Sequence, residues 1–305
     1  MVETLPTQYD KELKEAGIRA VRFNIDGGYC LTCGSDKSLK LWNPYKQILL
    51  KTYMGHGYEV LDCDSSFDNS QVVSCSADRT VVLWDVATGH LLRKFRGHLS
   101  RVNCVRFNKQ ESSVIVSGSY DSTVRCWDCR TRSLEPIQIM DDAKDSVPSL
   151  QVSEHEIITG SVDGYTRHYD LRQGCLKEDC MGEPVTSVSF TNDGQCILAS
   201  TLDSSIRLID KETGAVLNTF KGHQNKEYKI DSCLTTKDTH VISGSEDGSL
   251  YIWDLIQANI VKEIKGAHKN AIYSLARHPS KNIILTAATD TVKLWINSEE
   301  DLNED

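Results

Sequence analysis

The side chains with the clearest chemical potential are histidine, serine and aspartate, the residue types of a hydrolase triad. His98, Ser117 and Asp121 carry these groups and are followed by Trp127. The same set recurs three more times, with threonine replacing serine in the last copy. The other three sets are His56, Ser74, Asp78 and Trp84; His223, Ser243, Asp247 and Trp253; and His268, Thr286, Asp290 and Trp295. An active site is not expected four times in one chain, so we interpret these residues as structural and predict no enzyme activity.

Two Cys-x-x-Cys pairs could contribute to a zinc site, Cys30 with Cys33 and Cys126 with Cys129. Zinc requires four ligands in a tetrahedral arrangement. Both pairs lie in apparent strands, where residues three apart point to opposite faces. We therefore interpret them, like most of the eleven cysteines, as core residues of a protein in a reducing compartment. Glycine-rich phosphate loops, Walker sequences and His-Glu-x-x-His motifs are also absent from the sequence, so no metal or cofactor is predicted.

The elements that position these residues follow a regular repeat. The five tryptophans are separated by 42, 43, 126 and 42 residues. The long gap equals three periods and places the missing markers at Tyr169 and Ile209, each followed by an aspartate. An aspartate also stands six residues before each of the first six markers, and Asp290 stands five residues before Trp295. The chain therefore contains seven units.

Each unit is predicted to contain four strands. In the third unit, apolar residues alternate over 102–107, further strands are expected at 113–117 and 123–127, and a weaker one at 137–140. Glycine or proline turn signals separate the units. A period of about 40 to 45 residues, with four strands and with Gly-His and Trp-Asp signatures, is typical of a β-propeller.

Paired motifs bracket the complete units. They are Gly55-His56 with Trp84-Asp85, Gly97-His98 with Trp127-Asp128, and Gly222-His223 with Trp253-Asp254. In these motifs, which recur in register from about residue 7 to 296, the chain resembles the WD-repeat family. The resemblance implies an all-β fold, a seven-bladed WD40 β-propeller with four-stranded antiparallel blades, formed by residues 1–296 as a single domain. It also implies that the four residue sets form hydrogen-bonded tetrads inside their blades, which would satisfy buried polar groups.

The ring of a propeller must be closed, because an unpaired sheet edge after Trp295 would invite aggregation. Residues 7–13 stand where the outer strand preceding the first unit is expected. We therefore predict that they pair with the last blade. Residues 297–305 form a short acidic tail, which we expect to be disordered.

The resemblance also indicates where partners would bind. In WD-repeat proteins the favoured contact positions lie three and five residues after the histidine and directly before the turn aspartate, at the faces of the disc. Unit one lacks the histidine and is placed by alignment, and one inserted residue is allowed in unit six. These positions in this chain are then Arg19, Glu59, Leu61, Arg101, Asn103, Tyr120, Lys229, Glu246 and Tyr273. Arginine and tyrosine are common hot-spot residues, so Arg101, Tyr120 and Tyr273 are the strongest candidates.

Charge and hydropathy narrow the range of partners. The formal net charge of −9 argues against direct binding of nucleic acid, which requires clustered lysine and arginine. The sequence contains no run of 18 apolar residues and does not begin like a signal peptide, so no association with a membrane is predicted. We expect a monomeric propeller that binds other proteins in the cytoplasm, with the nucleus as an alternative location.

Several stretches resemble a narrower group, the mitogen-activated protein kinase organizers, over residues 20–36, 55–62, 94–98, 126–130 and 160–164. This likeness implies a non-catalytic scaffold for kinase-cascade components. The resemblance also connects the chain with spliceosomal assemblies and with hypoxia signalling through a prolyl hydroxylase, so a pre-mRNA splicing subunit is an alternative.

A further alternative is the substrate receptor of a cullin-type ubiquitin ligase. Residues 127–130 and 169–172 match, fully and nearly, the Trp-Asp-x-Arg signature of propellers that dock onto the ligase adaptor. Arg130 and Arg172 would then hold the adaptor. An arginine at this place can equally pair with a neighbouring carboxylate, and we favour that interpretation.

Overall fold

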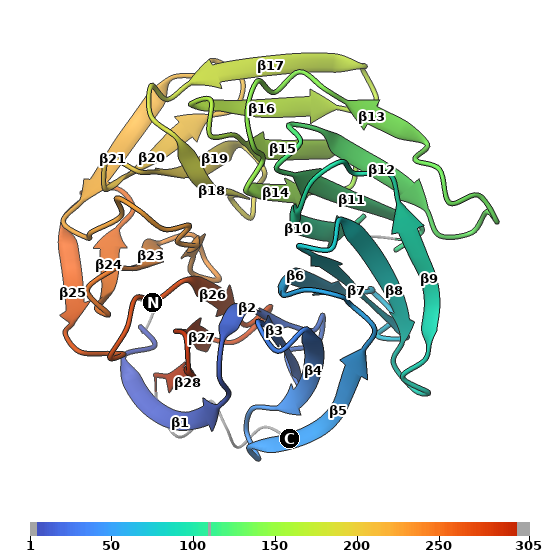
Figure 1. The fold of residues 1–305 in the computed structure, drawn as a ribbon. Coiled ribbons are helices and arrows are strands. Elements are labelled where there is room, and N and C mark those ends of the chain that lie inside the picture. The colour runs from blue at the N-terminus through green and yellow to red at the C-terminus, as the bar shows by residue number, and fades with distance from the viewer. Residues whose placement is uncertain (1–4, 109–110, 298–305) are drawn as a thin grey trace.

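A closed ring of seven four-stranded antiparallel sheets makes up the computed structural model, which describes residues 5–108 and 111–297. Figure 1 shows the ring face-on, with the first strand of each blade beside the central channel and the fourth at the circumference. This confirms the predicted seven-bladed β-propeller, since every blade contains the expected four strands.

The blades follow one another in chain order. Blades one to three are β2 (Ile18–Phe23), β3 (Cys30–Gly34), β4 (Ser38–Asn43) and β5 (Ile48–Met54); β6 (Val60–Ser65), β7 (Gln71–Ser76), β8 (Thr80–Asp85) and β9 (Leu91–Arg96); and β10 (Val102–Phe107), β11 (Val114–Ser119), β12 (Val124–Asp128) and β13 (Gln138–Met140). Blades four and five are β14 (Ser149–Val152), β15 (Glu156–Gly160), β16 (Tyr165–Asp170) and β17 (Cys175–Cys180); and β18 (Val185–Phe190), β19 (Cys196–Thr201), β20 (Ser205–Asp210) and β21 (Val216–Lys221).

Blades six and seven complete the ring. They are β22 (Ser232–Leu234), β23 (His240–Gly244), β24 (Leu250–Asp254) and β25 (Ile260–Ile264); and β26 (Ser274–Arg277), β27 (Ile284–Ala287), β28 (Thr291–Ile296) and β1 (Gln8–Lys14). The last blade thus takes its outer strand from the start of the chain. β1 pairs antiparallel with β28, with Leu13 opposite Val292, and this confirms the predicted ring closure. The predicted acidic tail lies, apart from Asn297, outside the described residues.

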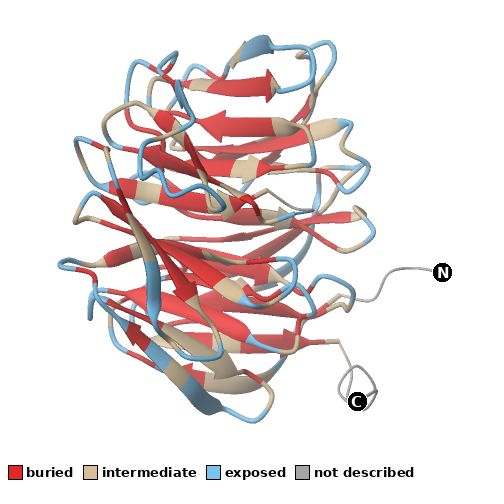
Figure 2. Cartoon of the chain, turned by 90° about the vertical axis from the view of Figure 1, so that its right-hand side faces the viewer, coloured by how far each residue is buried: buried red, intermediate tan, exposed pale blue. Residues whose placement is uncertain are grey.

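The hydrophobic core consists of seven clusters, and each cluster lies between two neighbouring blades. Alternation along the strands explains this arrangement, because successive side chains of a strand point to opposite faces of its sheet. The marker residues occupy equivalent places: Trp84 packs between blades one and two, Trp127 between two and three, Tyr169 between three and four, and Ile209 between four and five. Figure 2 shows the result edge-on, with buried strands inside the disc and exposed loops on its faces.

The cysteines follow the same alternation. Cys30 belongs to the cluster between blades seven and one, whereas Cys33 belongs to the cluster between blades one and two. The two thiols therefore point to opposite faces, as predicted. All eleven cysteines are free, and burial raises the pKa of Cys126 to about 12. Within residues 5–108 and 111–297, no group of three or more potential ligands could hold a metal ion.

Candidate protein-interaction site

The tetrads of blades two and three are continuous hydrogen-bonded chains. In blade three, the Nδ1 atom of His98 lies 3.0 Å from Asp121, its Nε2 atom lies 2.8 Å from Ser117, and the Trp127 indole donates to the same hydroxyl at 2.9 Å. In blade two, His56, Asp78, Ser74 and Trp84 repeat these contacts at 3.1, 2.8 and 2.8 Å. Each chain ties the loop before the inner strand to the second and third strands of the same blade.

Burial of these groups makes them poor candidates for catalysis. The serine of each chain is fully buried, and its hydroxyl already contacts both the histidine and the tryptophan. Burial lowers the pKa of His98 although Asp121 opposes the shift. Burial alone would raise the pKa of Asp121, but hydrogen bonds from His98 and Thr123 hold it well below its usual range. The arrangement satisfies polar groups and positions the loop that follows each histidine.

Blade seven departs from the predicted tetrad. His268 contacts Thr286 at 2.7 Å and Trp295 donates to Thr286 at 2.8 Å, but the Nδ1 atom of His268 contacts Thr291 at 2.8 Å instead of Asp290. The prediction for Asp290 was therefore wrong. The reason is spacing: this aspartate stands five residues before the tryptophan, whereas its counterparts stand six residues before theirs.

Blade six lacks the tetrad contacts. The Trp253 indole donates to the Lys221 carbonyl at 3.0 Å, and Ser243 donates to the carbonyl of Gly244 at 3.0 Å. An indole has one N–H donor. Because the Trp253 indole donates to Lys221, it cannot also donate a hydrogen bond to the Ser243 hydroxyl. Neither ring nitrogen of His223 has a hydrogen-bond partner among the described residues. Asp247 accepts instead from the backbone N–H of Ser249 at 2.8 Å, so the predicted tetrad of this blade was wrong.

Blades one, four and five, which lack the tetrad histidine, use other charged residues. In blade one, Glu15 accepts from Thr32 and pairs with Lys40 at 2.8 Å, and Trp42 donates to Thr32 at 2.9 Å. Blades four and five each use an arginine, buried in blade four and partly buried in blade five, that pairs with the turn aspartate four residues before it. These pairs are Arg167 with Asp163 at 2.9 Å and Arg207 with Asp203 at 2.7 Å.

Eight of the nine predicted contact residues line one mouth of the central channel. This mouth encloses a cavity of about 470 Å³. The predicted residues that line it are Arg19, Glu59, Leu61, Arg101, Asn103, Tyr120, Lys229 and Tyr273. They come from blades one, two, three, six and seven, which lie far apart in the sequence and meet at the channel because each inner strand begins there (Figure 1). We call this surface the tyrosine mouth.

Two pairs of side chains that include tyrosine rings line the tyrosine mouth. The Arg101 guanidinium lies 4.8 Å from the ring centroid of Tyr120, a cation–π contact within blade three. Tyr228 and Tyr273, from blades six and seven, meet edge-to-face with centroids 5.5 Å apart. About half of the Tyr120 surface is exposed, as is nearly half of the Tyr228 surface. The mouth thus presents rigid amphipathic rings beside the cations of Arg101 and Lys229.

Glu246 does not line this cavity, unlike the other predicted contact residues. Its Oε1 atom accepts from the backbone N–H groups of Lys226, Glu227 and Tyr228 at 2.7, 2.7 and 3.1 Å. Burial opposes ionisation of Glu246, but these three donors leave its pKa lowered. The insertion in unit six forms the loop that Glu246 holds, so this residue positions Tyr228 and does not face the cavity.

Several lining residues were not predicted. Val162 and Leu202 stand directly before the turn aspartates of units four and five, so applying the family position to every unit would have identified both. The buried residue that opens the inner strand lies four residues after His98 (Val102) but seven after His223 (Ile230), so unit six has three inserted residues and not the one that was allowed. Tyr228 and Glu227 lie in this longer insertion. Tyr228 stands five residues after His223, a favoured spacing that the allowance for an insertion passed over, whereas Glu227 matches none of the favoured positions.

A buried ion network lies at the base of the tyrosine mouth. Asp62 pairs with Arg22 at 2.9 Å and with Arg106 at 2.6 Å, and Arg22 also pairs with Asp231 at 2.9 Å. Burial would raise the pKa of Asp231, but Arg22 and then Lys229 lower it to about 2. These residues belong to blades one, two, three and six, so the network connects four inner strands across the channel. Beyond it, the opposite mouth encloses a cavity of about 660 Å³ with Phe23, Phe67 and Phe190 among its lining residues.

The two arginines considered for adaptor docking lie at the circumference, away from the cavity. Arg130 is exposed and contacts Asp128 at 3.2 Å. Arg172 is exposed and contacts His155. It does not line the cavity of the tyrosine mouth. Arg130 therefore pairs with a neighbouring carboxylate, which is the interpretation that the sequence analysis favoured over adaptor docking.

Comparison with known proteins defines the class of this propeller. A family model described as WD domain, G-beta repeat, matches residues 8–43 and 259–295, and one described as Nucleolar protein 10-like, N-terminal domain, matches residues 59–242. The fold, the Gly-His and Trp-Asp pairs and these matches define a WD-repeat β-propeller. The described residues contain no helix long and apolar enough to cross a membrane.

The relatives specify the group. The chain is 58% identical to WD repeat domain-containing protein 83 of Xenopus tropicalis over 94% of this chain and 91% of that protein. It is 55% identical to the protein of the same name from Homo sapiens, over 92% of this chain and 89% of that protein. A homologue from Dictyostelium discoideum is 39% identical over 92% and 95% of the two chains. The chain therefore belongs to the family of WD repeat domain-containing protein 83, for which mitogen-activated protein kinase organizer is another name.

Proposed function

We propose that this propeller is a non-catalytic scaffold that binds partner proteins through the tyrosine mouth. The observation that carries the proposal is the convergence of eight separately predicted residues on one cavity. Clustered tyrosine and arginine residues in a partly desolvated pocket are the usual composition of a protein hot spot. The ion network beneath the mouth joins four blades, so the site is built on a rigid support.

The charges of the mouth suit a polar protein segment. Arg101 and Lys229 provide cations, and Asp145 and Glu227 provide anions around the same cavity. Such a mixed rim sets the orientation of a partner more than its affinity, while the exposed tyrosine rings supply apolar contact area. A peptide or loop with both apolar and charged side chains fits this chemistry.

The partners that we propose are components of a mitogen-activated protein kinase cascade, assembled in the cytoplasm. The group to which the chain belongs, with its kinase-organizer name, supports this assignment. The ring has several faces, and a scaffold needs more than one surface to hold two partners at once. A role in a splicing complex would instead place the protein with nuclear ribonucleoproteins.

The test is a purification of native complexes with a matched pair of variants. The double variant Arg101→Glu, Tyr120→Ala removes the cation–π pair of the mouth. The control, Lys37→Glu with Tyr58→Ala, removes an exposed cation–π pair outside the cavity. We expect the first variant to lose at least one partner and the control to keep all of them, since loss of a hot spot costs about 2 kcal/mol or more.

The identity of the lost partners decides between the two roles. Kinase-cascade proteins in a cytosolic fraction would support the proposal. Recovery of splicing factors alone, from a nuclear fraction, would replace it with the splicing assignment. Full retention of partners by the first variant, with unchanged melting temperature, would show that binding does not use the tyrosine mouth.

A further inference from the structure

We propose that the edge of the disc between blades two and three binds an acidic, leucine-containing segment of a partner protein. The surface consists of outer strand β9 and the loop 129–137 that joins β12 to β13. We call it the arginine edge, and its residues are Leu92, Arg93, Arg96, Arg130, Arg132, Leu134 and Ile137. It lies at the circumference and is separate from the tyrosine mouth.

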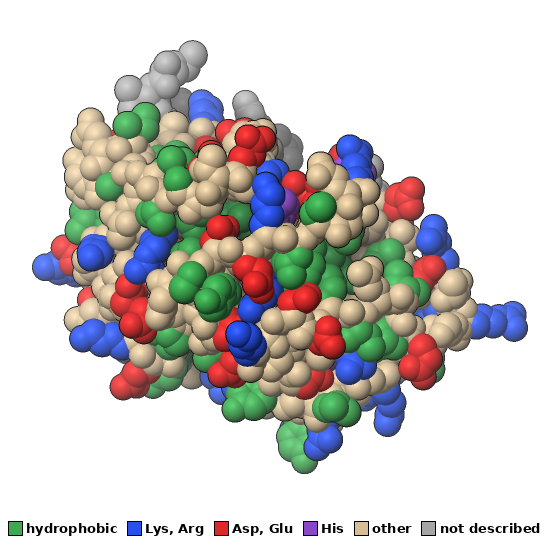
Figure 3. Space-filling model, turned by 90° about the horizontal axis from the view of Figure 1, so that it is seen from above, with side chains coloured by type: hydrophobic (Ala, Val, Ile, Leu, Met, Phe, Trp, Pro, Cys, Tyr) green, Lys and Arg blue, Asp and Glu red, His purple; other side chains and the backbone are tan. Residues whose placement is uncertain are grey.

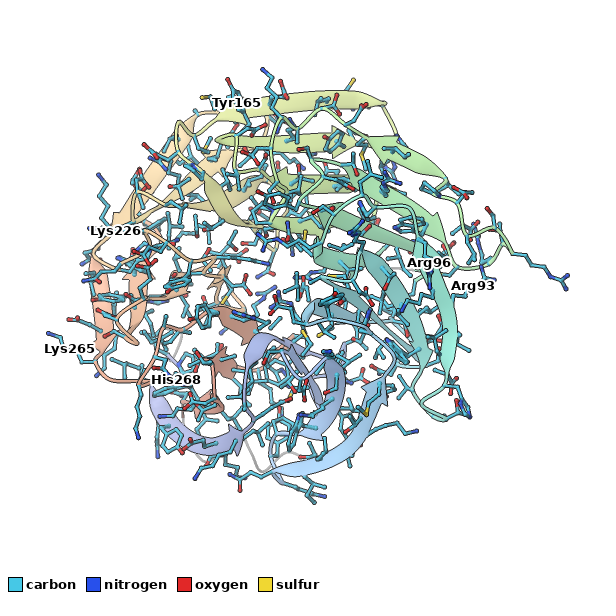
Figure 4. The ribbon with its side chains drawn as sticks, in the orientation of Figure 1. Arg93, Arg96, Tyr165, Lys226, Lys265 and His268 are labelled. Carbon is cyan, nitrogen blue, oxygen red and sulfur yellow. The ribbon has the colours of Figure 1, made fainter. Side chains whose placement is uncertain are left out.

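Strand β9 and the loop lie side by side. Arg93 donates a hydrogen bond to the carbonyl oxygen of Thr131, and Phe95 packs against Trp127 with ring centroids 5.5 Å apart. Figure 4 shows Arg93 and Arg96 on β9 beside this protruding loop. Arg93 and Phe95 therefore face blade three, whereas Arg96 alternates with Phe95 and lies on the other face of β9, toward blade one. The arginine edge thus includes both faces of the outer strand together with the loop of blade three.

Positive charge on the arginine edge is largely uncompensated. Strand β9 contains no aspartate or glutamate, and the loop 129–137 contains one acid, Glu135. No carboxylate among the described residues pairs with Arg93, Arg96 or Arg132. Arg130 alone is shared, between Asp128 and Glu111. The outer strands β17 and β25 differ, since they carry acids beside their lysines. Figure 3, viewed over β17, shows acidic and basic side chains intermixed.

A local excess of cations is notable on a chain whose net charge is −9. Exposed charges are screened beyond about 8 Å at physiological ionic strength, so the arginines act on a docked partner more strongly than the distant acids do. Arginine binds carboxylates in a bidentate manner and is only weakly hydrated. The edge therefore selects carboxylate-rich segments.

Exposed apolar residues specify the partner further. Leu92, Leu134 and Ile137 are 45%, 47% and 58% exposed beside the arginines. A segment in which acids alternate with leucines would pair with the cations and cover these side chains together. A nucleic acid is a poorer match, because its long phosphate chain would extend over the acidic remainder of the surface and leave the apolar residues uncovered.

The test measures binding of a synthetic peptide in which aspartate and glutamate alternate with leucine, by fluorescence anisotropy of the labelled peptide. The variant is Arg93→Glu, Arg96→Glu, Arg132→Glu. The control is Lys221→Glu, Lys262→Glu, Lys265→Glu on blades five and six, which makes the same change in net charge on exposed residues elsewhere on the disc. We expect about tenfold weaker binding, or more, by the arginine variant and unchanged binding by the control.

Two further arms make the result specific. A peptide with serine in place of leucine should bind the wild-type protein more weakly, since it cannot cover the apolar residues. The Arg101→Glu, Tyr120→Ala variant should bind the leucine peptide normally, which separates this proposal from the function of the tyrosine mouth. Equal loss of binding by both triple variants, or no binding by the wild-type protein, would overturn the proposal. Tighter, arginine-dependent binding of single-stranded oligouridine would overturn it in favour of RNA.

Discussion

His223 lies edge-on against Trp253 with ring centroids 5.4 Å apart, yet neither of its ring nitrogens is hydrogen-bonded within the described structure. His98 in blade three has two partners, Ser117 and Asp121. We expect His98→Leu to destabilise the fold by about 1 to 3 kcal/mol, because buried partners lose their bonds, and His223→Leu to cost less. Urea unfolding of both variants measures the difference. Equal losses would show that the two histidines are energetically alike.

Stability should fall as the pH drops from about 6.5 to about 4. Burial lowers the pKa of His223 to about 4, and burial with the nearby Lys293 lowers the pKa of His268 to about 4. The unfolded chain binds a proton at each histidine near pH 6.5, whereas the folded protein binds it only near pH 4. Between these two pH values, protonation therefore stabilises the unfolded chain and lowers the free energy of unfolding. Each histidine lowers the free energy of unfolding by about 3 kcal/mol at most over this window, since one pKa unit corresponds to about 1.4 kcal/mol.

The variant His223→Leu isolates one of these contributions. Between pH 7 and 4, its free energy of unfolding should decline less steeply than that of the wild-type protein. Below pH 4 the two slopes should converge, because the histidine is then protonated in both states. Identical slopes throughout would mean that His223 titrates normally in the folded protein.

Removal of residues 1–14 should destabilise the whole ring. The deletion removes β1, exposes the edge of β28 and takes Leu13 from the cluster between blades seven and one. A melting temperature well below that of the full chain, with a greater tendency to aggregate, is expected. Removal of residues 1–4 leaves β1 in place and serves as the control. If both truncated proteins melt alike, β1 does not contribute to closure in solution.

Asp62→Asn should be among the most destabilising single changes. Asp62 is fully buried and neutralises both Arg22 and Arg106. Loss of its charge leaves two guanidinium groups undercompensated, at a cost of about 3 to 5 kcal/mol. Glu59→Gln, which breaks the exposed pair with Arg19, should cost about 1 kcal/mol or less. Denaturant titration compares the two, and similar midpoints would contradict a supporting role for the network.

Glu246→Ala should impair binding more than folding. The carboxylate holds the loop that carries Tyr228, through three backbone N–H groups. Without it, Tyr228 should leave the edge of Tyr273, and hydrogen exchange at residues 226–228 should accelerate. The melting temperature should change little, because the loop is exposed. Exchange at the wild-type rate would show that the loop keeps its shape by other contacts.

Regular spacing made much of this protein predictable. The recurrence of tryptophan and aspartate was sufficient to count seven blades, to place Tyr169 and Ile209 in the gap, and to assign the closing strand near residues 7–13. Family positions also located eight of the residues that line the tyrosine mouth. These features depend on register, and every blade repeats the same register.

Contacts that depend on local departures from the repeat were decided only in the folded structure. In blade seven, Asp290 stands one residue closer to the tryptophan than its counterparts do, and His268 contacts Thr291 instead. In blade six, the Trp253 indole donates to the Lys221 carbonyl and not to Ser243. The insertion in unit six brings Tyr228 to the mouth and turns Glu246 into its support. A hydrogen bond requires its atoms within a few tenths of an ångström, and such distances follow from how seven blades pack around one channel, which spacing along the chain does not specify.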